Sequence, residues 1–112
     1  MLKRIVIKVG SNVLSAPKSG LDMERIKNLT IQIAALKKMG IEIILVSSGA
    51  VAAGRSTISL SKKTDEISKR QLLAAVGQIK LINTYADLFE KQGFLCAQVL
   101  VTKEDFRDRE HY

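Results

Sequence analysis

The sequence is poor in the residues that stabilise secreted and membrane proteins. Its 112 residues include one cysteine, one proline, one histidine and no tryptophan. Cys96 has no partner for an internal disulfide, which favours a reducing compartment, so we expect a cytoplasmic protein. No apolar run approaches the roughly 20 residues of a membrane span, and Lys8 interrupts the first apolar run. We therefore expect neither a membrane partner nor an export signal.

Aromatic residues and clustered charge are also scarce. Aromatic residues make up 4% of the chain, which leaves few rings to stack on nucleic-acid bases. Eighteen Lys and Arg residues against eleven Asp and Glu residues give a net charge of +7, which would suit a polyanion. The basic residues are dispersed in short groups, however: Lys3-Arg4, Lys37-Lys38, Lys62-Lys63, Lys69-Arg70 and Arg107/Arg109. This dispersal argues against a nucleic-acid partner, and steep salt-dependent binding would be needed to revive that alternative.

Metal-ligand patterns are absent as well. His111 has no cysteine, histidine or aspartate cluster at ligand spacing, so we expect no metal site made by this chain alone. Cys96 alternates within an apolar segment, and we interpret it as a small core residue rather than a nucleophile.

The chain does have enough apolar residues, 46%, to form a core, and it is long enough for one domain or part of one. Apolar, β-branched runs predict buried strands at residues 3–9, 41–47 and 94–101. Helical spacing predicts helices at residues 22–39, from about residue 50, at 65–91, and from about Asp105. This order indicates an α/β fold with a parallel sheet, its first strand covered on both faces. Three strands are few for such a sheet, so we expect the first part of something larger.

Local signals support the first long helix. Asp22 is the expected N-cap, Leu21 and Ile26 a hydrophobic staple, and Gly40 the stop signal. The apolar residues that recur at helical spacing are Ile26, Leu29, Ile33, Leu36 and Met39. In the second long helix, Gly77 is expected to bend or split the helix, and small residues at 74, 75 and 77 to permit close helix packing.

The first candidate site follows the first strand. Lys8 precedes Gly10, Ser11 and Asn12, and ligands of open α/β sheets bind outside the carboxyl ends of the strands. A lysine there can meet a phosphate, Gly10 lets the backbone turn sharply, and Ser11 and Asn12 add backbone N–H donors. The alternative is a lysine at a strand end that extends to water, and the local pattern does not decide between them.

The second candidate site follows the second strand. Ser48, Gly49 and Ala50 form a strand-to-helix turn whose backbone N–H groups would favour a carboxylate or phosphate. The alternative is ordinary N-capping by Ser48. Residues 49–56 imitate a phosphate-binding loop with Arg55 in the lysine position, but we reject that motif because residues 50–53 are helix-forming. No GxGxxG pattern supports a dinucleotide site.

Four segments in order carry a family resemblance. They are Lys8–Val13, Ser47–Gly54, Gln71–Gln78 and Asp108–Tyr112. The first two resemble the amino acid kinase family as a whole. With the last two, the sequence resembles the glutamate 5-kinases within that family, over essentially all 112 residues.

The resemblance implies a three-layer α/β/α parallel-sheet fold and phosphorylation of the γ-carboxylate of L-glutamate with ATP and Mg²⁺, the first step of proline biosynthesis. Lys8 would be catalytic, contacting the ATP phosphates. Gly10, Ser11 and Asn12 would complete the phosphate-binding turn, and Ser48, Gly49 and Ala50 would hold glutamate.

Family members continue well beyond this length. We therefore expect residues 1–112 to form the N-terminal, substrate-side part of a single kinase domain, inactive alone and a homo-oligomer when complete. Two alternatives stay open: another amino acid kinase, specific for aspartate or uridylate, and a non-catalytic half-domain that binds an anion or docks on a partner.

Overall fold

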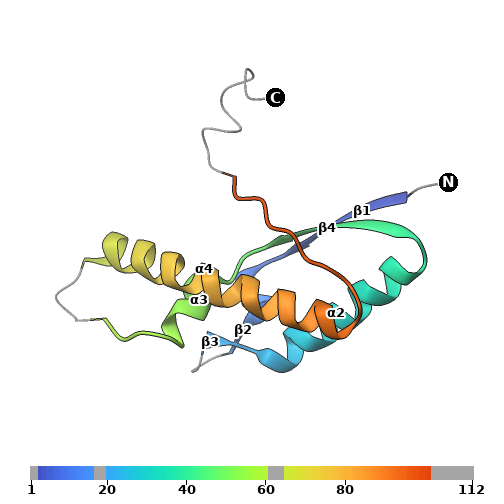
Figure 1. The fold of residues 1–112 in the computed structure, drawn as a ribbon. Helices are drawn as coiled ribbons and strands as arrows, with labels where there is room; N and C mark the ends of the chain where they lie inside the picture. Colours follow the sequence, from blue (N-terminus) through green and yellow to red (C-terminus); the bar gives the residue numbers. More distant parts are fainter. Residues whose placement is uncertain (1–2, 17–19, 61–64, 102–112) are drawn as a thin grey trace, which may run out of the picture.

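The computed structural model describes residues 3–16, 20–60 and 65–101. Two strands and three helices form most of this part of the chain (Figure 1). The elements in chain order are β1 Lys3–Val9, α1 Ser11–Leu14, β2 Ser15–Ala16, β3 Gly20–Leu21, α2 Met23–Lys38, β4 Ile41–Ser47, α3 Ala50–Arg55 and α4 Glu66–Lys91.

The predicted parallel sheet is confirmed for its first two strands. β1 pairs with β4 in parallel along its whole length, with Lys3 opposite Ile41 and Val9 opposite Ser47. The chain between them returns through α2, as parallel strands require. Helices α2 and α4 lie on the same side of this strand pair (Figure 1). Val9 belongs to the core, and Ile7, Ile43 and Leu45 pack against it.

The other face of the strand pair is uncovered among the described residues. Val6 is 61% exposed, and Ile44 and Val46 are about half exposed. The expectation that the first strand is covered on both faces is therefore wrong for this part of the chain. The continuous apolar run predicted two covered faces, but the described helices cover only one.

Helix α2 begins and ends close to the predicted residues. The Arg25 N–H donates to Oδ1 of Asp22 over 3.1 Å, which confirms the predicted N-cap. Gly40 has φ +86°, the left-handed conformation expected after a helix end. Ile26 and Ile33 are buried, but Met39 is 74% exposed because it is the C-cap residue, beyond the last turn that faces the core.

Helices α3 and α4 approach each other through two glycines. A Cβ atom at Gly77 would overlap the Ala50 carbonyl oxygen and the Gly54 nitrogen, and one at Gly54 would overlap the Leu73 carbonyl. The predicted close packing is thus confirmed at Gly77, whereas Ala75 is exposed. Helix α4 continues unbroken through Gly77, so the prediction that this glycine splits the helix is wrong: the contact with α3 occupies the position.

Between Gly10 and Leu21 the described residues contain structure that the sequence did not indicate. Residues 11–14 form the short helix α1, and β2 pairs with β3 antiparallel over two residues each. Leu14 is fully buried, and its carbonyl accepts the Asp22 N–H. Burial of one leucine anchors the segment beneath α2.

The predicted third strand is not formed. Helix α4 ends at Lys91, and beyond it the Gly93 and Phe94 N–H groups donate to the carbonyls of Glu90 and Phe89. Residues 94–101 then run without regular structure, and Leu95 is fully exposed. A strand requires a partner for its backbone groups, and no described segment pairs with this one.

Cys96 lies in the same segment and is exposed, so its expected core position is wrong. Partial burial raises the pKa of its thiol, which disfavours a reactive thiolate. Several features of the sequence lie outside the described residues. They are Pro17, the Lys62-Lys63 pair, His111, the helix expected from Asp105 and the motif at Asp108–Tyr112. Within those residues, no helix combines the length and apolarity that crossing a membrane would require.

Candidate functional site

The parallel register brings the two predicted turns together. Lys8 lies opposite Val46 and Val9 opposite Ser47, and the Ser48 N–H continues the pairing by donating to the Val9 carbonyl over 2.9 Å. Both strands therefore end at the same edge, one followed by Gly10–Asn12 and the other by Ser48–Ala50. This edge is where open α/β sheets bind ligands.

Arg4 and Lys8, near opposite ends of β1, differ in their ion pairing. At the amino end, Arg4 Nε donates to Oε2 of Glu42 over 2.9 Å, so this cation is paired. At the carboxyl end, Lys8 is exposed, faces Val46 across the pair and forms no ion pair with another described residue. A free ammonium at the carboxyl edge favours an anionic ligand there.

The turn after β1 differs from its prediction in one respect. Gly10 has φ −78° and ψ 160°, a conformation open to any residue, so it is not required for a sharp turn. A Cβ atom at Gly10 would have no described atom within 4 Å. Ser11 and Asn12 are exposed and begin α1, so their backbone N–H groups have no acceptor within the helix. Open space beside the Gly10 backbone suits the close approach of a ligand.

The turn after β4 is built around Gly49. Its φ of +114° lies in the left-handed region, and it is the N-cap residue of α3, without a side-chain cap. The alternative interpretation, N-capping by Ser48, is therefore wrong. Ser48 is exposed, and its hydroxyl forms no hydrogen bond within the described part of the chain. Helix α3 spans residues 50–55, which supports rejection of the phosphate-loop motif there.

Two residues beside this turn were missed by the sequence reasoning. Ser47 Oγ lies 2.7 Å from Tyr85 Oη, which connects the end of β4 to α4. Tyr85 is buried with Leu81 and Phe89 along one face of α4, a spacing that signals only a core position. The signal that could have indicated more is its hydroxyl, because a buried tyrosine normally directs this group to a polar partner.

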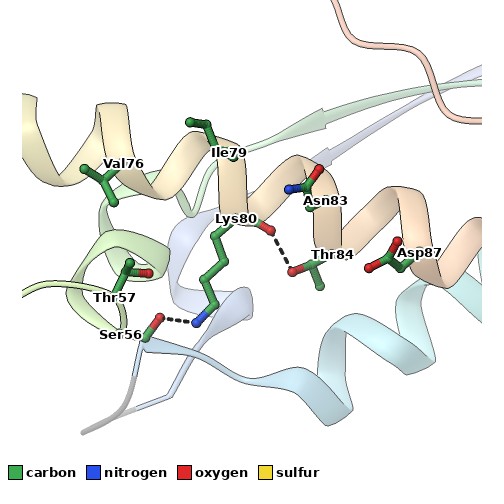
Figure 2. Close-up of a pocket in the computed structure, with 8 residues that line it drawn as sticks. All are labelled: Ser56, Thr57, Val76, Ile79, Lys80, Asn83, Thr84 and Asp87. Carbon is green, nitrogen blue, oxygen red and sulfur yellow. Dashed lines mark hydrogen bonds between the residues drawn. The ribbon is translucent and has the colours of Figure 1, made fainter.

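A groove on the flank of α3 and α4 does not contain any predicted site residue. Figure 2 shows Lys80 Nζ reaching Ser56 Oγ, at 2.7 Å, with Asn83, Thr84 and Asp87 further along α4. The groove is open and shallow, and its lysine is already hydrogen-bonded within the chain. In the described residues no group of three His, Cys, Asp or Glu side chains is placed to hold a metal ion.

The parallel strand pair with helices on one face defines the class as an α/β protein. The Amino acid kinase family model matches residues 3–112, and the chain belongs to that family. It is 56% identical over 110 residues to the glutamate 5-kinase of Chlorobaculum tepidum and 56% over 109 residues to that of Bacteroides thetaiotaomicron. It is 46% identical over 110 residues to that of Acinetobacter baylyi.

These alignments cover 97–98% of the chain but only 29–30% of each relative. The chain thus spans about 30% of the length of the curated relatives it matches.

Proposed function

We propose that this chain forms the substrate-side, N-terminal part of a single kinase domain that phosphorylates the γ-carboxylate of L-glutamate with MgATP. The product would be γ-glutamyl phosphate, the first intermediate of proline biosynthesis. The names and similarity of the three relatives support this proposal. The proposal makes L-glutamate and MgATP the partners of the complete protein, which we expect to be a cytoplasmic homo-oligomer.

One observation carries the proposal: the Ser48 N–H donates to the Val9 carbonyl at the end of the β1–β4 pair. This bond holds the two turns side by side at one edge. Transfer of a phosphoryl group to a carboxylate requires two anions to approach each other, so two adjacent anion-binding turns suit the reaction.

The proposed roles follow from the chemistry of each group. The Lys8 ammonium would contact the ATP phosphates and stabilise the charge that develops during transfer. Gly10, Ser11 and Asn12 would approach the phosphates with backbone N–H groups, and Ser48, Gly49 and Ala50 would bind glutamate. A carboxylate is already ionised at neutral pH, so these residues need to supply charge and orientation rather than a general base.

The described residues fit the anionic substrates better than the metal. Mg²⁺ prefers oxygen ligands and commonly takes them from substrate phosphates and water. When bound, it would neutralise charge on the nucleotide phosphates. Because no acidic cluster for a metal occurs among residues 3–16, 20–60 and 65–101, we assign no metal ligand to them.

The direct test is an ATP-dependent assay on the complete gene product, with hydroxylamine trapping the acyl phosphate. Hydroxamate formation that requires L-glutamate and ATP would support the proposal. Turnover of aspartate or UMP in place of glutamate would favour another amino acid kinase. Anion binding without turnover would favour the non-catalytic alternative.

Ser48 offers a test of the glutamate-binding turn. Ser48→Ala removes an exposed hydroxyl that no described residue uses, so folding should be unaffected. We expect the KM for glutamate to rise on the order of tenfold to a hundredfold, with little change in the KM for ATP, because a hydrogen bond to a charged group is lost. Ser59→Ala, which removes another exposed hydroxyl, is the control. A change confined to ATP binding would contradict the assignment.

A further inference from the structure

A chain of two hydrogen bonds connects α4 to the turn after β4. Tyr85 Oη lies 2.7 Å from Ser47 Oγ, and Ser47 Oγ donates to the Ser48 carbonyl over 2.8 Å. The two bonds link residues 38 positions apart in the sequence. They end on the peptide group that joins Ser48 to Gly49.

The number of hydroxyl protons determines which group donates in each of these two hydrogen bonds. A serine hydroxyl has one proton, and the carbonyl oxygen of Ser48 can only accept. The Ser47 proton is therefore committed to Ser48, and the Tyr85 hydroxyl must donate to Ser47 Oγ. Burial raises the pKa of Tyr85, with the Ser47 hydrogen bond opposing this in part, so the phenol stays protonated and able to donate at neutral pH.

The hydrogen bond to the Ser48 carbonyl also fixes the direction of the Gly49 N–H, because both groups belong to one peptide unit. The peptide bond is planar and trans here, so its C=O and N–H point in opposite directions. Holding the Ser48 carbonyl toward Ser47 therefore directs the Gly49 N–H the other way. No acceptor among the described residues takes this N–H, and Gly49 itself has a left-handed conformation, φ +114°, which favours glycine.

The tyrosine is well suited to serve as a fixed anchor. Tyr85 is 3% exposed and belongs to the core cluster. Its ring stacks on Phe89 with centroids 6.1 Å apart and an interplanar angle of 19°. A buried ring that is stacked on its neighbour loses little further freedom when its hydroxyl donates.

We propose that Tyr85 is a positioning residue that acts through Ser47 to orient the Ser48–Gly49 peptide, so that the Gly49 N–H meets a carboxylate of the amino acid substrate. This inference rests on the proposed function, because the substrate defines which ligand the oriented N–H receives. Tyr85 itself does not touch the substrate.

The test is steady-state kinetics of the complete gene product with Tyr85→Phe, which keeps the ring and its packing. We expect the KM for glutamate to rise about fivefold while kcat and the KM for ATP stay within twofold, since loss of one neutral hydrogen bond corresponds to roughly that factor. Loss of thermal stability without a change in the KM for glutamate would overturn the inference. An equal rise in both KM values would also overturn it.

Variants of Ser47 test whether Tyr85 acts on the Ser48–Gly49 peptide through Ser47. Ser47→Ala should raise the KM for glutamate at least as much as Tyr85→Phe, and Tyr85→Phe should add nothing in the Ser47→Ala background. Ser47→Thr keeps the hydroxyl and should restore a nearly normal KM. Thr30→Val is the matched control, because it removes another buried hydroxyl, 1% exposed, whose bond to the Lys27 carbonyl lies within α2. Additive effects in the double variant would show that Tyr85 does not act through Ser47.

A second measurement separates this inference from the proposed function. The Gly49 amide signal in a ¹H–¹⁵N correlation spectrum reports the orientation of the peptide without any substrate. It should shift in Tyr85→Phe and Ser47→Ala and stay in place in Thr30→Val. If wild-type protein fails to phosphorylate glutamate, the proposed function fails while the shift still supports the orienting role of Tyr85. An unchanged Gly49 signal overturns that role whatever the substrate.

Discussion

Individual side chains differentiate the two ends of the β1–β4 pair. Arg4 is neutralised by Glu42 at the amino end, whereas Lys8 faces an apolar neighbour at the carboxyl end. An unpaired cation attracts anions more effectively than a paired one, because no neighbouring carboxylate cancels its field. We therefore predict that Lys8, rather than the net charge of +7, is the electrostatic feature that matters for function.

Lys8→Ala should reduce kcat of the complete protein on the order of 10²-fold, with a small effect on the KM for glutamate, because the charge acts mainly on the transferring phosphoryl group. Lys8→Arg should not restore full turnover, since a planar guanidinium does not reproduce a compact ammonium. Lys3→Ala is the control, because Lys3 is an exposed lysine at the opposite end of the same strand. Near-normal kcat in Lys8→Ala would exclude the proposed role.

At the scale of elements, the packing of α3 on α4 places the second turn. Gly54 and Gly77 let the two backbones approach each other, and the hydrogen bond from Tyr85 to Ser47 then holds the end of β4 against α4. The turn at Ser48–Ala50 is thus fixed from two sides. Its position depends on small residues and one hydroxyl rather than on its own conformational preference.

Gly77→Ala tests the role of this packing. Alanine gains about 1 kcal/mol of helix propensity over glycine, but its Cβ would overlap backbone atoms of Ala50 and Gly54, which cannot move alone. We expect overpacking to dominate and the free energy of unfolding to fall by about 2 kcal/mol, with a raised KM for glutamate as α3 shifts. Ala75→Ser, which adds one atom on the exposed side of α4, is the control for denaturant unfolding. Equal or greater stability in Gly77→Ala would contradict the close approach.

At the scale of the whole molecule, the described residues form two layers rather than three. Helices cover one face of the strand pair (Figure 1). Val6, Ile44 and Val46 leave the other face apolar and exposed. Three neighbouring apolar side chains on a flat strand surface favour association with another apolar surface. The expected homo-oligomer and the third layer of the kinase fold remain predictions.

The exposed face predicts the behaviour of the 112-residue chain. We expect it to self-associate with increasing concentration, and Val6→Glu combined with Ile44→Lys to shift it toward monomer, since the two positions lie opposite each other and would pair their charges. Net charge is unchanged by this pair. Asn28→Glu combined with Gln32→Lys adds the same charges to exposed positions of α2 and is the control in sedimentation velocity. Equal association of both double variants would show that another surface is responsible.

Much of the fold could be predicted because its signals are local. The caps at Asp22 and Gly40 and the strands at residues 3–9 and 41–47 were correct, since capping and periodicity depend on neighbours in the sequence. The strand expected at residues 94–101 was wrong because strand formation depends on a partner elsewhere. The assignment of Gly10 to the site stays a prediction, but the sharp turn expected of it is wrong: its conformation is ordinary, and only its surroundings distinguish it.

The sequence by itself determined the order of the principal elements, the family, and the identity of the residues at the two turns. Only the tertiary structure decided that these turns lie side by side and that Tyr85 reaches Ser47. It also decided that Arg4 pairs with Glu42, whereas Lys8 forms no ion pair with another described residue. The physical reason is the separation along the sequence of the residues that interact. Helix periods and caps act over a few residues, whereas strand register, close helix packing and a hydrogen bond between residues 47 and 85 depend on how distant segments pack together.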